Sequence, residues 1–260
     1  MLSFSRYVRP SAVEDAYALA QERGSVLLGG MLWLRLQNRR VSTAVDLGDL
    51  GLNQIEDGGD RFRIGASVTL RELETHEELN RLTGGAFRTA LAPIVGVQFR
   101  NLATVGGSVF GRFGFSDLLT LLMALNASVT LYHAGELPLY EFAGMGRVRD
   151  VLTHVTVPKT PLSASYLAQR NTAADFPVLT VSAALREGKL RCAVGARPLR
   201  AVLLPEVDLN AGAFDPADFA GNAANALSFA SNRRASEEYR RHLCRVLLRR
   251  AVEETLKRGN

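Results

Sequence analysis

The chain has 260 residues, of which 47% are hydrophobic and 22% charged, proportions typical of a globular protein with one or two domains. Its two cysteines, Cys192 and Cys244, lie far apart, which excludes a disulfide scaffold and a four-cysteine metal site held by this chain alone. No run of about 18 apolar residues predicts a membrane span, and the first residues lack the apolar core of a signal peptide. We therefore expect a cytoplasmic protein, because free cysteines suit a reducing compartment.

The net charge of +5 is concentrated at the C-terminus. Residues 231–260 hold nine Lys or Arg against four Asp or Glu, so the first 230 residues sum to zero. Apolar residues recur in this segment at helical spacing, namely Tyr239, Leu243, Val246, Leu247 and Ala251. The pattern predicts an amphipathic helix with a solvated basic face. Tyr239 is the only Phe, Tyr or Trp residue in this basic segment, so nucleic-acid binding is not expected.

The first part of the chain predicts a small parallel unit. Ser11 and Glu14 form a capping-box pattern ahead of an amphipathic helix that ends near Gly24. A buried strand at 25–28, a helical stretch at 31–37 and a second strand at 43–47 follow. This strand–helix–strand order is typical of parallel pairing.

The middle of the chain predicts strands and short helices around one unassigned segment. Thr69 and Glu72 form a second capping box, directly after a strand at 62–68. The other predicted elements are a helix at 86–92, a buried helix at 117–125 and strands at 128–132 and 151–157. Residues 96–116 are rich in glycine and show no clear period.

After Pro158 the pattern changes to antiparallel. Strands are predicted at 163–170, 178–186 and 189–194, with Glu187-Gly188 as the turn between the last two. A helix then begins at Asp215-Pro216, and the basic helix follows. We place a domain boundary near residue 160.

Two glycine pairs, Gly29-Gly30 and Gly106-Gly107, are the features that point to chemistry. Glycine allows backbone to approach a ligand closely, and backbone N–H groups at a helix start attract phosphate. Each pair alone is more typical of a tight turn. The sequence lacks a G-x-G-x-x-G motif after a strand, a Walker A motif and a G-x-S-x-G motif, so those sites are not predicted.

The residues around the second pair settle the interpretation. The run Phe99-Arg100-Asn101-Leu102-Ala103-Thr104-Val105-Gly106-Gly107-Ser108, followed by Ser116-Asp117-Leu118, resembles the FAD-binding (medium) subunits of the xanthine dehydrogenase, or molybdenum hydroxylase, family. Other segments resemble that family in the same order, namely Leu28-Gly29-Gly30, residues 64–70, residues 170–178 and residues 235–241. The resemblance covers nearly the whole chain.

The resemblance implies an α+β fold of two parts. Residues 1–158 would form a two-subdomain FAD-binding domain of the PCMH type, divided at about residue 55. Residues 162–260 would form a C-terminal domain of a small three-stranded antiparallel sheet with a helical bundle. The implied function is electron transfer through noncovalently bound FAD, from [2Fe–2S] clusters on one partner subunit to NAD or another acceptor. Molybdopterin would lie on a second partner subunit.

The resemblance also assigns the binding residues. The first loop would wrap the pyrophosphate with backbone N–H groups and consists of Leu27, Leu28, Gly29, Gly30, Met31, Leu32 and Trp33. The second would approach from the other side with Thr104, Val105, Gly106, Gly107 and Ser108. Asp117 would accept hydrogen bonds from ribose or ribityl hydroxyls, although a helix N-cap is an equal interpretation. Ile94 and Leu152 would contact the ring systems. No catalytic side chain and no metal ligand is implied.

Some residues depart from the family pattern and keep alternatives open. Met31 and Leu32 replace hydroxyl-bearing or acidic residues, so phosphate recognition there must rest on the backbone. Ser108 replaces the usual asparagine. Arg112 is an unusual charge beside the loop and could meet a phosphate, a partner carboxylate or solvent. A flavin-free assembly subunit of the same fold and a stand-alone flavin reductase or nucleotide-binding module are the alternative functions.

Overall fold

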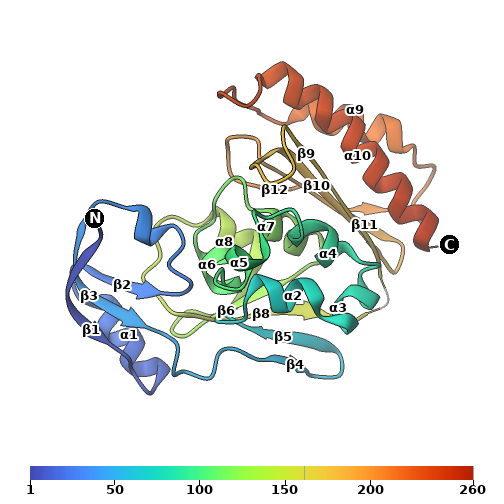
Figure 1. The fold of residues 1–260 in the computed structure, drawn as a ribbon. Helices are drawn as coiled ribbons and strands as arrows, with labels where there is room; N and C mark the ends of the chain where they lie inside the picture. The colour runs from blue at the N-terminus through green and yellow to red at the C-terminus, as the bar shows by residue number, and fades with distance from the viewer. Residues whose placement is uncertain (161, 260) are drawn as a thin grey trace.

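The N-terminal part is a three-stranded parallel sheet with one helix. The computed structural model describes residues 1–160 and 162–259. The strands β1 (Ser3–Val8), β2 (Ser25–Leu28) and β3 (Arg40–Asp46) pair in the order β1-β3-β2, and α1 (Val13–Gln21) packs on β2 and β3 (Figure 1). The predicted parallel pairing of β2 with β3 is confirmed, whereas β1 was not predicted.

Two local predictions in this part are wrong. Helix α1 begins after Ala12, which makes no side-chain cap, so Ser11 and Glu14 do not form a capping box. The predicted helix at 31–37 is reduced to a single 3-10 turn, η1 (Leu34–Leu36). Met31 has φ of +59°, a left-handed conformation that ends any helix at that point.

The middle part is a five-stranded antiparallel sheet in the order β4-β5-β8-β6-β7. Its strands are β4 (Ile55–Asp57), β5 (Arg61–Gly65), β6 (Ser128–Leu131), β7 (Gly135–Pro138) and β8 (Leu152–Pro158). Its helices are α2 (Leu70–Thr75), α3 (Glu77–Leu82), α4 (Ala86–Leu91), α5 (Val97–Arg100), α6 (Val105–Phe110), α7 (Asp117–Ala124) and α8 (Leu139–Gly144). The capping box of Thr69 and Glu72 at α2 is confirmed, and the segment without a clear period forms α5 and α6.

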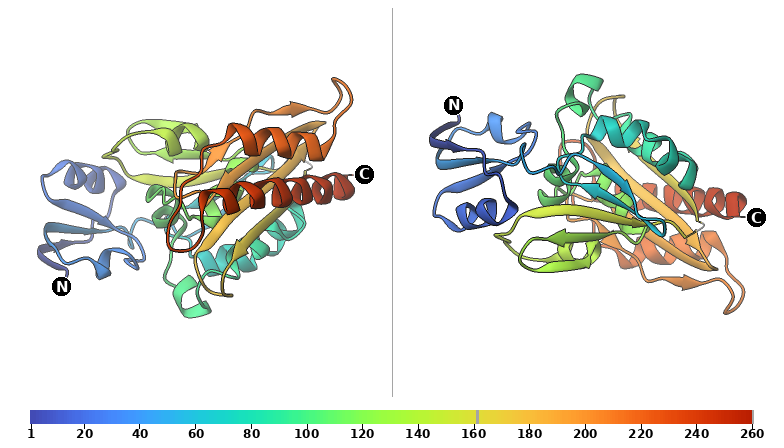
Figure 2. Two further views of the ribbon diagram at one scale, coloured as in Figure 1. Left: turned by 90° about the horizontal axis from the view of Figure 1, so that it is seen from above. Right: turned by 90° about the horizontal axis from the view of Figure 1, so that it is seen from below.

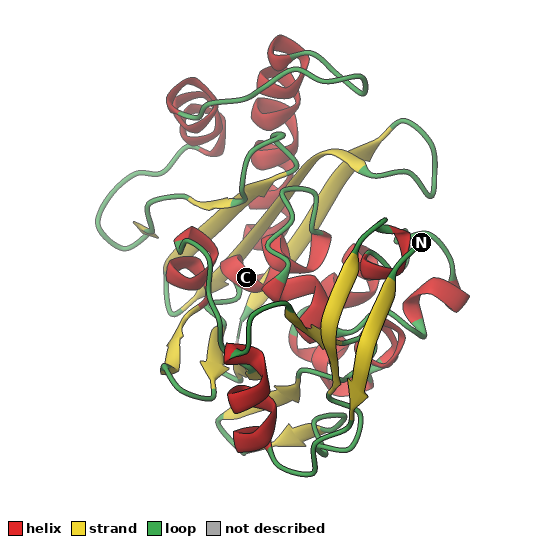
Figure 3. Ribbon diagram, turned by 90° about the vertical axis from the view of Figure 1, so that its left-hand side faces the viewer, coloured by secondary structure: helices red, strands yellow, loops and turns green. Residues whose placement is uncertain are grey.

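The C-terminal part is an antiparallel sheet between two layers of helices. Its long strands are β9 (Ser163–Arg170), β10 (Pro177–Arg186) and β11 (Lys189–Gly195), and two short strands that were not predicted, β12 (Val202–Leu203) and β13 (Val207–Asp208), pair with β11. Helices α9 (Pro216–Ala226) and α10 (Glu237–Gly259) lie side by side over one face (Figure 2), and α4 and α7 pack against the other. Figure 3 shows these layers from the side of the N-terminal sheet.

The main hydrophobic core crosses the junction between the middle and C-terminal parts. It joins α7, which is buried along its length, to inward-facing residues of β9, β10 and β11, among them Ala164, Tyr166, Ala184 and Ala193. A second cluster fills the space between the sheet and α10. The two parts therefore share apolar packing, and burial of this kind is the main stabilising contribution to a fold.

The basic C-terminal helix is less solvated than its composition suggests. Arg240 is only 1% exposed and donates hydrogen bonds to the carbonyl oxygens of Val178, Ala230 and Ala235. Tyr239, which the spacing placed on the apolar face, is 44% exposed. In the described part of the chain, no helix is long and apolar enough to cross a bilayer.

Candidate functional site

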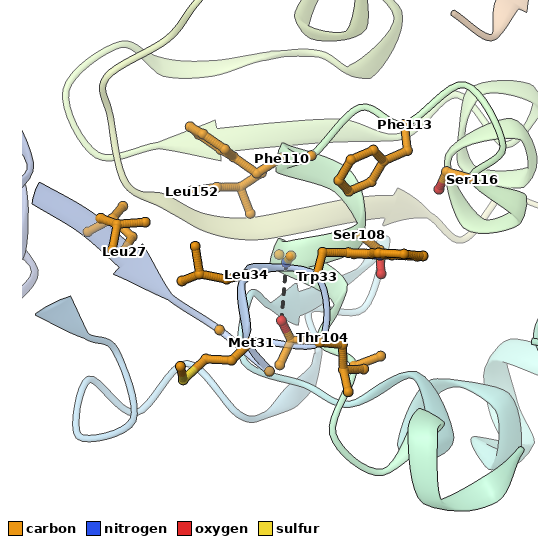
Figure 4. Close-up of a pocket in the computed structure, with 18 of the residues that line it drawn as sticks. Leu27, Met31, Trp33, Leu34, Thr104, Ser108, Phe110, Phe113, Ser116 and Leu152 are labelled. Carbon is orange, nitrogen blue, oxygen red and sulfur yellow. Dashed lines mark hydrogen bonds between the residues drawn. The ribbon is translucent and has the colours of Figure 1, made fainter. Parts of the chain in front are cut away.

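A cavity of about 640 Å³ lies where the N-terminal sheet, the start of α6 and the β9–β10 connection meet. This volume is in the range of cofactor sites. Figure 4 shows its central region, with Met31, Trp33 and Leu34 from the loop after β2, Thr104 and Ser108 at α6, and Leu152 from β8. The cavity is thus assembled from segments far apart in the sequence.

The loop after β2 lines this cavity and has unpaired backbone donors among the described residues. Strand β2 ends at Leu28, and none of the backbone N–H groups of residues 29–33 donates a hydrogen bond to another described residue. The carbonyls of this loop do bond locally, since Met31 accepts from Arg35 and Trp33 accepts from Leu36. Consecutive N–H groups around a left-handed residue such as Met31 form a concave site that attracts anions. The loop can therefore hold a phosphate through backbone alone.

The two glycine pairs lie against each other, as the pyrophosphate interpretation requires. A Cβ added at Gly29 would lie 2.7 Å from the Thr104 hydroxyl oxygen. A Cβ added at Gly30 would lie 1.7 Å from the Leu102 carbonyl oxygen, which no backbone could tolerate. Close approach of the two loops therefore requires glycine at position 30, whereas a Cβ at position 29 would need only the Thr104 hydroxyl to move.

The second glycine pair differs from the first because its N–H groups are already bonded. Val105 and Gly106 donate to the carbonyls of Val68 and Ala66 at 2.8 and 2.7 Å, and Ser108 donates to the carbonyl of Thr104. Gly107 donates to the Thr104 hydroxyl at 3.1 Å (Figure 4). In this structure the second loop therefore offers side chains to the cavity, above all the Thr104 hydroxyl, whose own proton is still available to a ligand.

An aromatic cluster, which the sequence did not reveal, closes one end of the cavity. Trp33 lies 5.6–5.8 Å, centroid to centroid, from Phe113, Phe115 and Phe176. Phe113 stacks on Phe115 at 5.2 Å, and the guanidinium of Arg234 lies over Phe176. The signal available in the sequence was Phe113 and Phe115, two of the four phenylalanines of the glycine-rich segment. Such a cluster provides a flat apolar surface suited to a ring system.

Asp117 sits at the same end, buried and strongly held. One of its oxygens, Oδ1, accepts from the hydroxyl of Tyr166 and the guanidinium of Arg170, and the described residues place no donor on Oδ2. Burial raises the pKa of Asp117 to about 6, although Arg170 and Tyr166 both favour the ionised form. The N-cap of α7 is Ser116, so the capping interpretation of Asp117 is wrong.

Arg112 is a structural residue. It donates hydrogen bonds to the carbonyls of Met145 and Gly146 at 2.8 and 2.9 Å, at the C-terminal end of α8, and lies over the ring of Phe142. Burial and the neighbouring Arg200 lower its pKa. The structure therefore adds a role to the three left open for Arg112, because its Nη1 supports the backbone at the end of α8.

Nearly all of the residues assigned from the sequence line the cavity. Those that do are Leu27, Gly29, Gly30, Met31, Leu32, Trp33, Ile94, Thr104, Gly106, Gly107, Ser108, Asp117 and Leu152. The side chains of Leu28 and Val105 are buried away from it, as alternation along β2 and the turn of α6 require. Additional lining residues include the aromatic cluster, Arg170 and, at the opposite end, Arg39, Arg40, Arg147 and Arg149.

The two cysteines take no part in the site. Cys192 on β11 and Cys244 on α10 are buried in the core cluster between the sheet and this helix, and their burial raises the pKa of both thiols. Among the described residues, no group of three or more His, Cys, Asp or Glu side chains could hold a metal ion.

Residues 2–160 match the sequence profile of the FAD binding domain in molybdopterin dehydrogenase. The chain belongs to this family. It is 27% identical to the nicotine 6-hydroxylase medium subunit of Paenarthrobacter nicotinovorans, over 96% of each chain, and 28% identical to the carbon monoxide dehydrogenase medium chain of Afipia carboxidovorans, over 97% of each. Its fold matches a chain of the carbon monoxide dehydrogenase from Hydrogenophaga pseudoflava with a TM-score of 0.86, at 20% identity over 97% of both chains. The predicted family, fold class and membership among oxidoreductase subunits are confirmed.

The cavity fits the FAD that the family implies. Its unpaired N–H groups at residues 29–33 suit a pyrophosphate, and the glycines beside them leave space that a Cβ would fill. The aromatic cluster and the buried Leu152 provide apolar surface for the rings. Met31 and Leu32 therefore do not weaken the case for FAD, because the backbone supplies the donors that their side chains lack.

Proposed function

We propose that this chain is the FAD-carrying electron-transfer subunit of a cytoplasmic molybdenum-containing hydroxylase. In this proposal one partner oxidises the substrate at molybdopterin, a second holds [2Fe–2S] clusters, and this chain links those clusters to NAD or another acceptor. Membership of the FAD-binding family and the names of its relatives, a hydroxylase medium subunit and a dehydrogenase medium chain, support the proposal. We also propose the domain division at residues 1–158 and 162–260, with subdomains meeting at about residue 55.

The residues of the cavity would then share the work of binding. The N–H groups of residues 29–33 would hold the pyrophosphate, and the Thr104 hydroxyl would donate to it from the other side. Asp117 would accept a ribose or ribityl hydroxyl at its open Oδ2, while Arg170 and Tyr166 hold its other oxygen. Bound FAD supplies the redox chemistry, and the protein supplies binding, orientation and electrostatics.

The unpaired N–H groups facing a second glycine loop are the observation that carries FAD binding. The test is to purify the chain with its native partners, release the flavin with acid and measure its amount. FAD in roughly equal amount to the chain supports the proposal. A folded complex without flavin would instead support the assembly subunit.

A reconstitution experiment tests the electron-transfer role. The isolated chain should show no more than NADH–dye activity, and mixing it with separately purified molybdenum and iron–sulfur subunits should restore turnover from substrate to acceptor. Oxidation of an organic substrate with NAD by the isolated chain would contradict the proposal and favour a stand-alone enzyme.

A further inference from the structure

One wall of the cavity is an irregular segment whose local hydrogen bonds form a single short helical stretch after Gly96 and leave the turn at Val95 outside it. Residues 94–104 contribute Ile94, Val95, Phe99, Ala103 and Thr104 to the lining, and their only helix is the four-residue α5. Val95 has φ of +50° and is 54% exposed. A β-branched residue in this conformation is a true outlier and persists only where the surrounding structure enforces it.

The side chain of Arg100 holds the backbone next to Val95 in place. Its side chain is 5% exposed and does not line the cavity. Its Nε donates to Oε2 of Glu74 at 2.6 Å, and its Nη1 donates at 2.9 Å to the carbonyl of Ile94, directly before Val95. Glu74 lies on α2, is 6% exposed at its side chain and also accepts from Arg71 at 2.8 Å. The guanidinium therefore joins the strained turn to a fixed helix.

The far end of the wall is tied to the same helix. The N–H of Leu70, the first residue of α2, donates to the carbonyl of Ala103 at 2.8 Å, and Thr69 pairs with Thr104. Between these two ties lies Leu102, whose carbonyl is the atom against which Gly30 packs. A shift of this wall would therefore displace the loop after β2, which lines the cavity.

We propose that the Arg100–Glu74 pair is a positioning pair that sets the affinity for FAD without touching it. The inference rests on the proposed FAD-binding function. It assigns the arginine of the Arg-Asn-x-Ala-Thr run to the support of the cavity wall. Binding sites need their contacting groups held by a shell of locked side chains, and buried ion pairs with fixed geometry are suited to that task.

Two variants of the full chain test the proposal. Arg100→Lys keeps the charge opposite Glu74 but cannot also reach the Ile94 carbonyl with a planar fork, so the fold should persist. The double variant Arg100→Met with Glu74→Leu removes both charges, a replacement that is often neutral for stability. We expect the FAD dissociation constant to rise about threefold in the first and tenfold or more in the second, since small displacements of positioned groups carry large costs.

The measurements separate positioning from general stability. Flavin fluorescence titration gives the dissociation constant, thermal unfolding gives the midpoint, and hydrogen exchange reports the N–H groups of residues 95–103. Faster exchange there, with weaker FAD binding and an unchanged midpoint, supports the proposal. Arg81→Met is the matched control, because Arg81 forms an exposed ion pair with Glu78 on the neighbouring helix α3.

Two outcomes would contradict different claims. FAD affinity equal to that of the wild-type chain in both Arg100 variants would overturn the positioning role and leave the proposed function intact. A wild-type chain that binds no FAD would overturn the proposed function itself.

Discussion

The two glycine pairs of this chain look alike in the sequence and differ in the structure. After β2, the pair opens a loop that lines the cavity and whose N–H groups have no partner among the described residues. At α6, the N–H groups of both glycines are bonded, one to strand-end backbone and one to the Thr104 hydroxyl. Backbone N–H groups without a partner can bind a ligand, whereas those already bonded within the protein stabilise the fold.

If FAD binds as proposed, the backbone donors of the first loop would serve binding, whereas those of the second loop are used in packing. Gly30 and Gly106 each face backbone, so their missing Cβ atoms allow two segments to touch. Gly29 and Gly107 each face the Thr104 side chain beside the cavity. The contrast therefore runs within each pair as well as between them, and substitutions can test both levels.

Gly30→Ala is expected to have the largest effect. The new Cβ would lie 1.7 Å from the Leu102 carbonyl oxygen, with backbone on both sides of the contact. The two loops must separate, at a cost of about 2–3 kcal/mol in the free energy of unfolding, and FAD should be lost. Urea denaturation and acid-released flavin measure the two effects. Retention of both stability and FAD would show that the loops need not touch.

Gly107→Val and Gly106→Ala should separate binding from packing in the second pair. At Gly107 a Cβ meets only the Thr104 hydroxyl, at 3.1 Å, so a valine projects beside the cavity and should release FAD with a stability change within about 1 kcal/mol. At Gly106 a Cβ would lie 2.8 Å from Ala66, so alanine should cost about 1–3 kcal/mol while the folded fraction keeps its FAD. Flavin content per folded molecule is the measurement, and identical behaviour of the two variants would refute the distinction.

Because of Asp117, the free energy of unfolding and FAD retention should both depend on pH near 6. Its pKa is raised from 3.8 to about 6, so the folded protein binds this proton more tightly than the unfolded chain does. The free energy of unfolding therefore gains, from this group alone, up to about 1.4 kcal/mol per pH unit as pH falls from 6 to 4. Above pH 6 the ionised carboxylate holds Arg170, and FAD retention should be highest there.

The check compares wild type with Asp117→Asn in urea denaturation across this range. The rise in the free energy of unfolding between pH 6 and pH 4 should be missing from the variant. Asp175→Asn is the control, because Arg234 lowers the pKa of Asp175, which is the opposite direction to the shift at Asp117. Equal pH profiles for wild type and Asp117→Asn would show that Asp117 does not titrate near 6.

Much of the architecture could be predicted from the sequence, because hydrophobic periodicity, turn residues and helix-capping residues mark the strands and helices. The structure confirms three such predictions, namely the strand after Glu187-Gly188, the helix start at Asp215-Pro216 and the capping box at Thr69. Strand β1 was missed because it is an exposed edge strand with no apolar alternation. The helix expected at 31–37 failed because the left-handed Met31 breaks it, a conformation that no propensity reveals.

The parts of the candidate site that carry a sequence motif were predicted. The parts that tertiary packing brings together from distant segments were missed. The glycine loops were found, but the N–H groups of the second loop donate to the carbonyls of Val68 and Ala66, which lie far from it in the sequence. Phe176 and Arg170 reach the cavity from the C-terminal sheet, so only the folded chain brings them to Trp33 and Asp117.

Thr104 is the residue through which the two loops meet, and its hydroxyl can be tested apart from its shape. Thr104→Val keeps the branched side chain but leaves the N–H of Gly107 without its acceptor, at a cost of about 1 kcal/mol. FAD affinity should fall with it, because the same hydroxyl faces the cavity. Thr104→Ser should restore the FAD affinity, measured by titration, and the stability, measured by denaturation. A valine variant with full affinity would assign Thr104 to capping alone.

Met31→Gly should have the smallest effect and is the most direct test of binding by backbone. Glycine adopts the left-handed conformation of Met31 without strain, which offsets its greater freedom in the unfolded chain, so stability should change by less than about 0.5 kcal/mol. The N–H groups of the loop keep their positions, and the FAD dissociation constant should stay within about twofold of wild type, since no side-chain contact is lost. Met31→Pro is the matched control, because proline removes one N–H group and cannot adopt a positive φ, so it should lose FAD. A large loss of affinity in Met31→Gly would mean that the methionine side chain, and not the backbone beside it, makes the contact that matters.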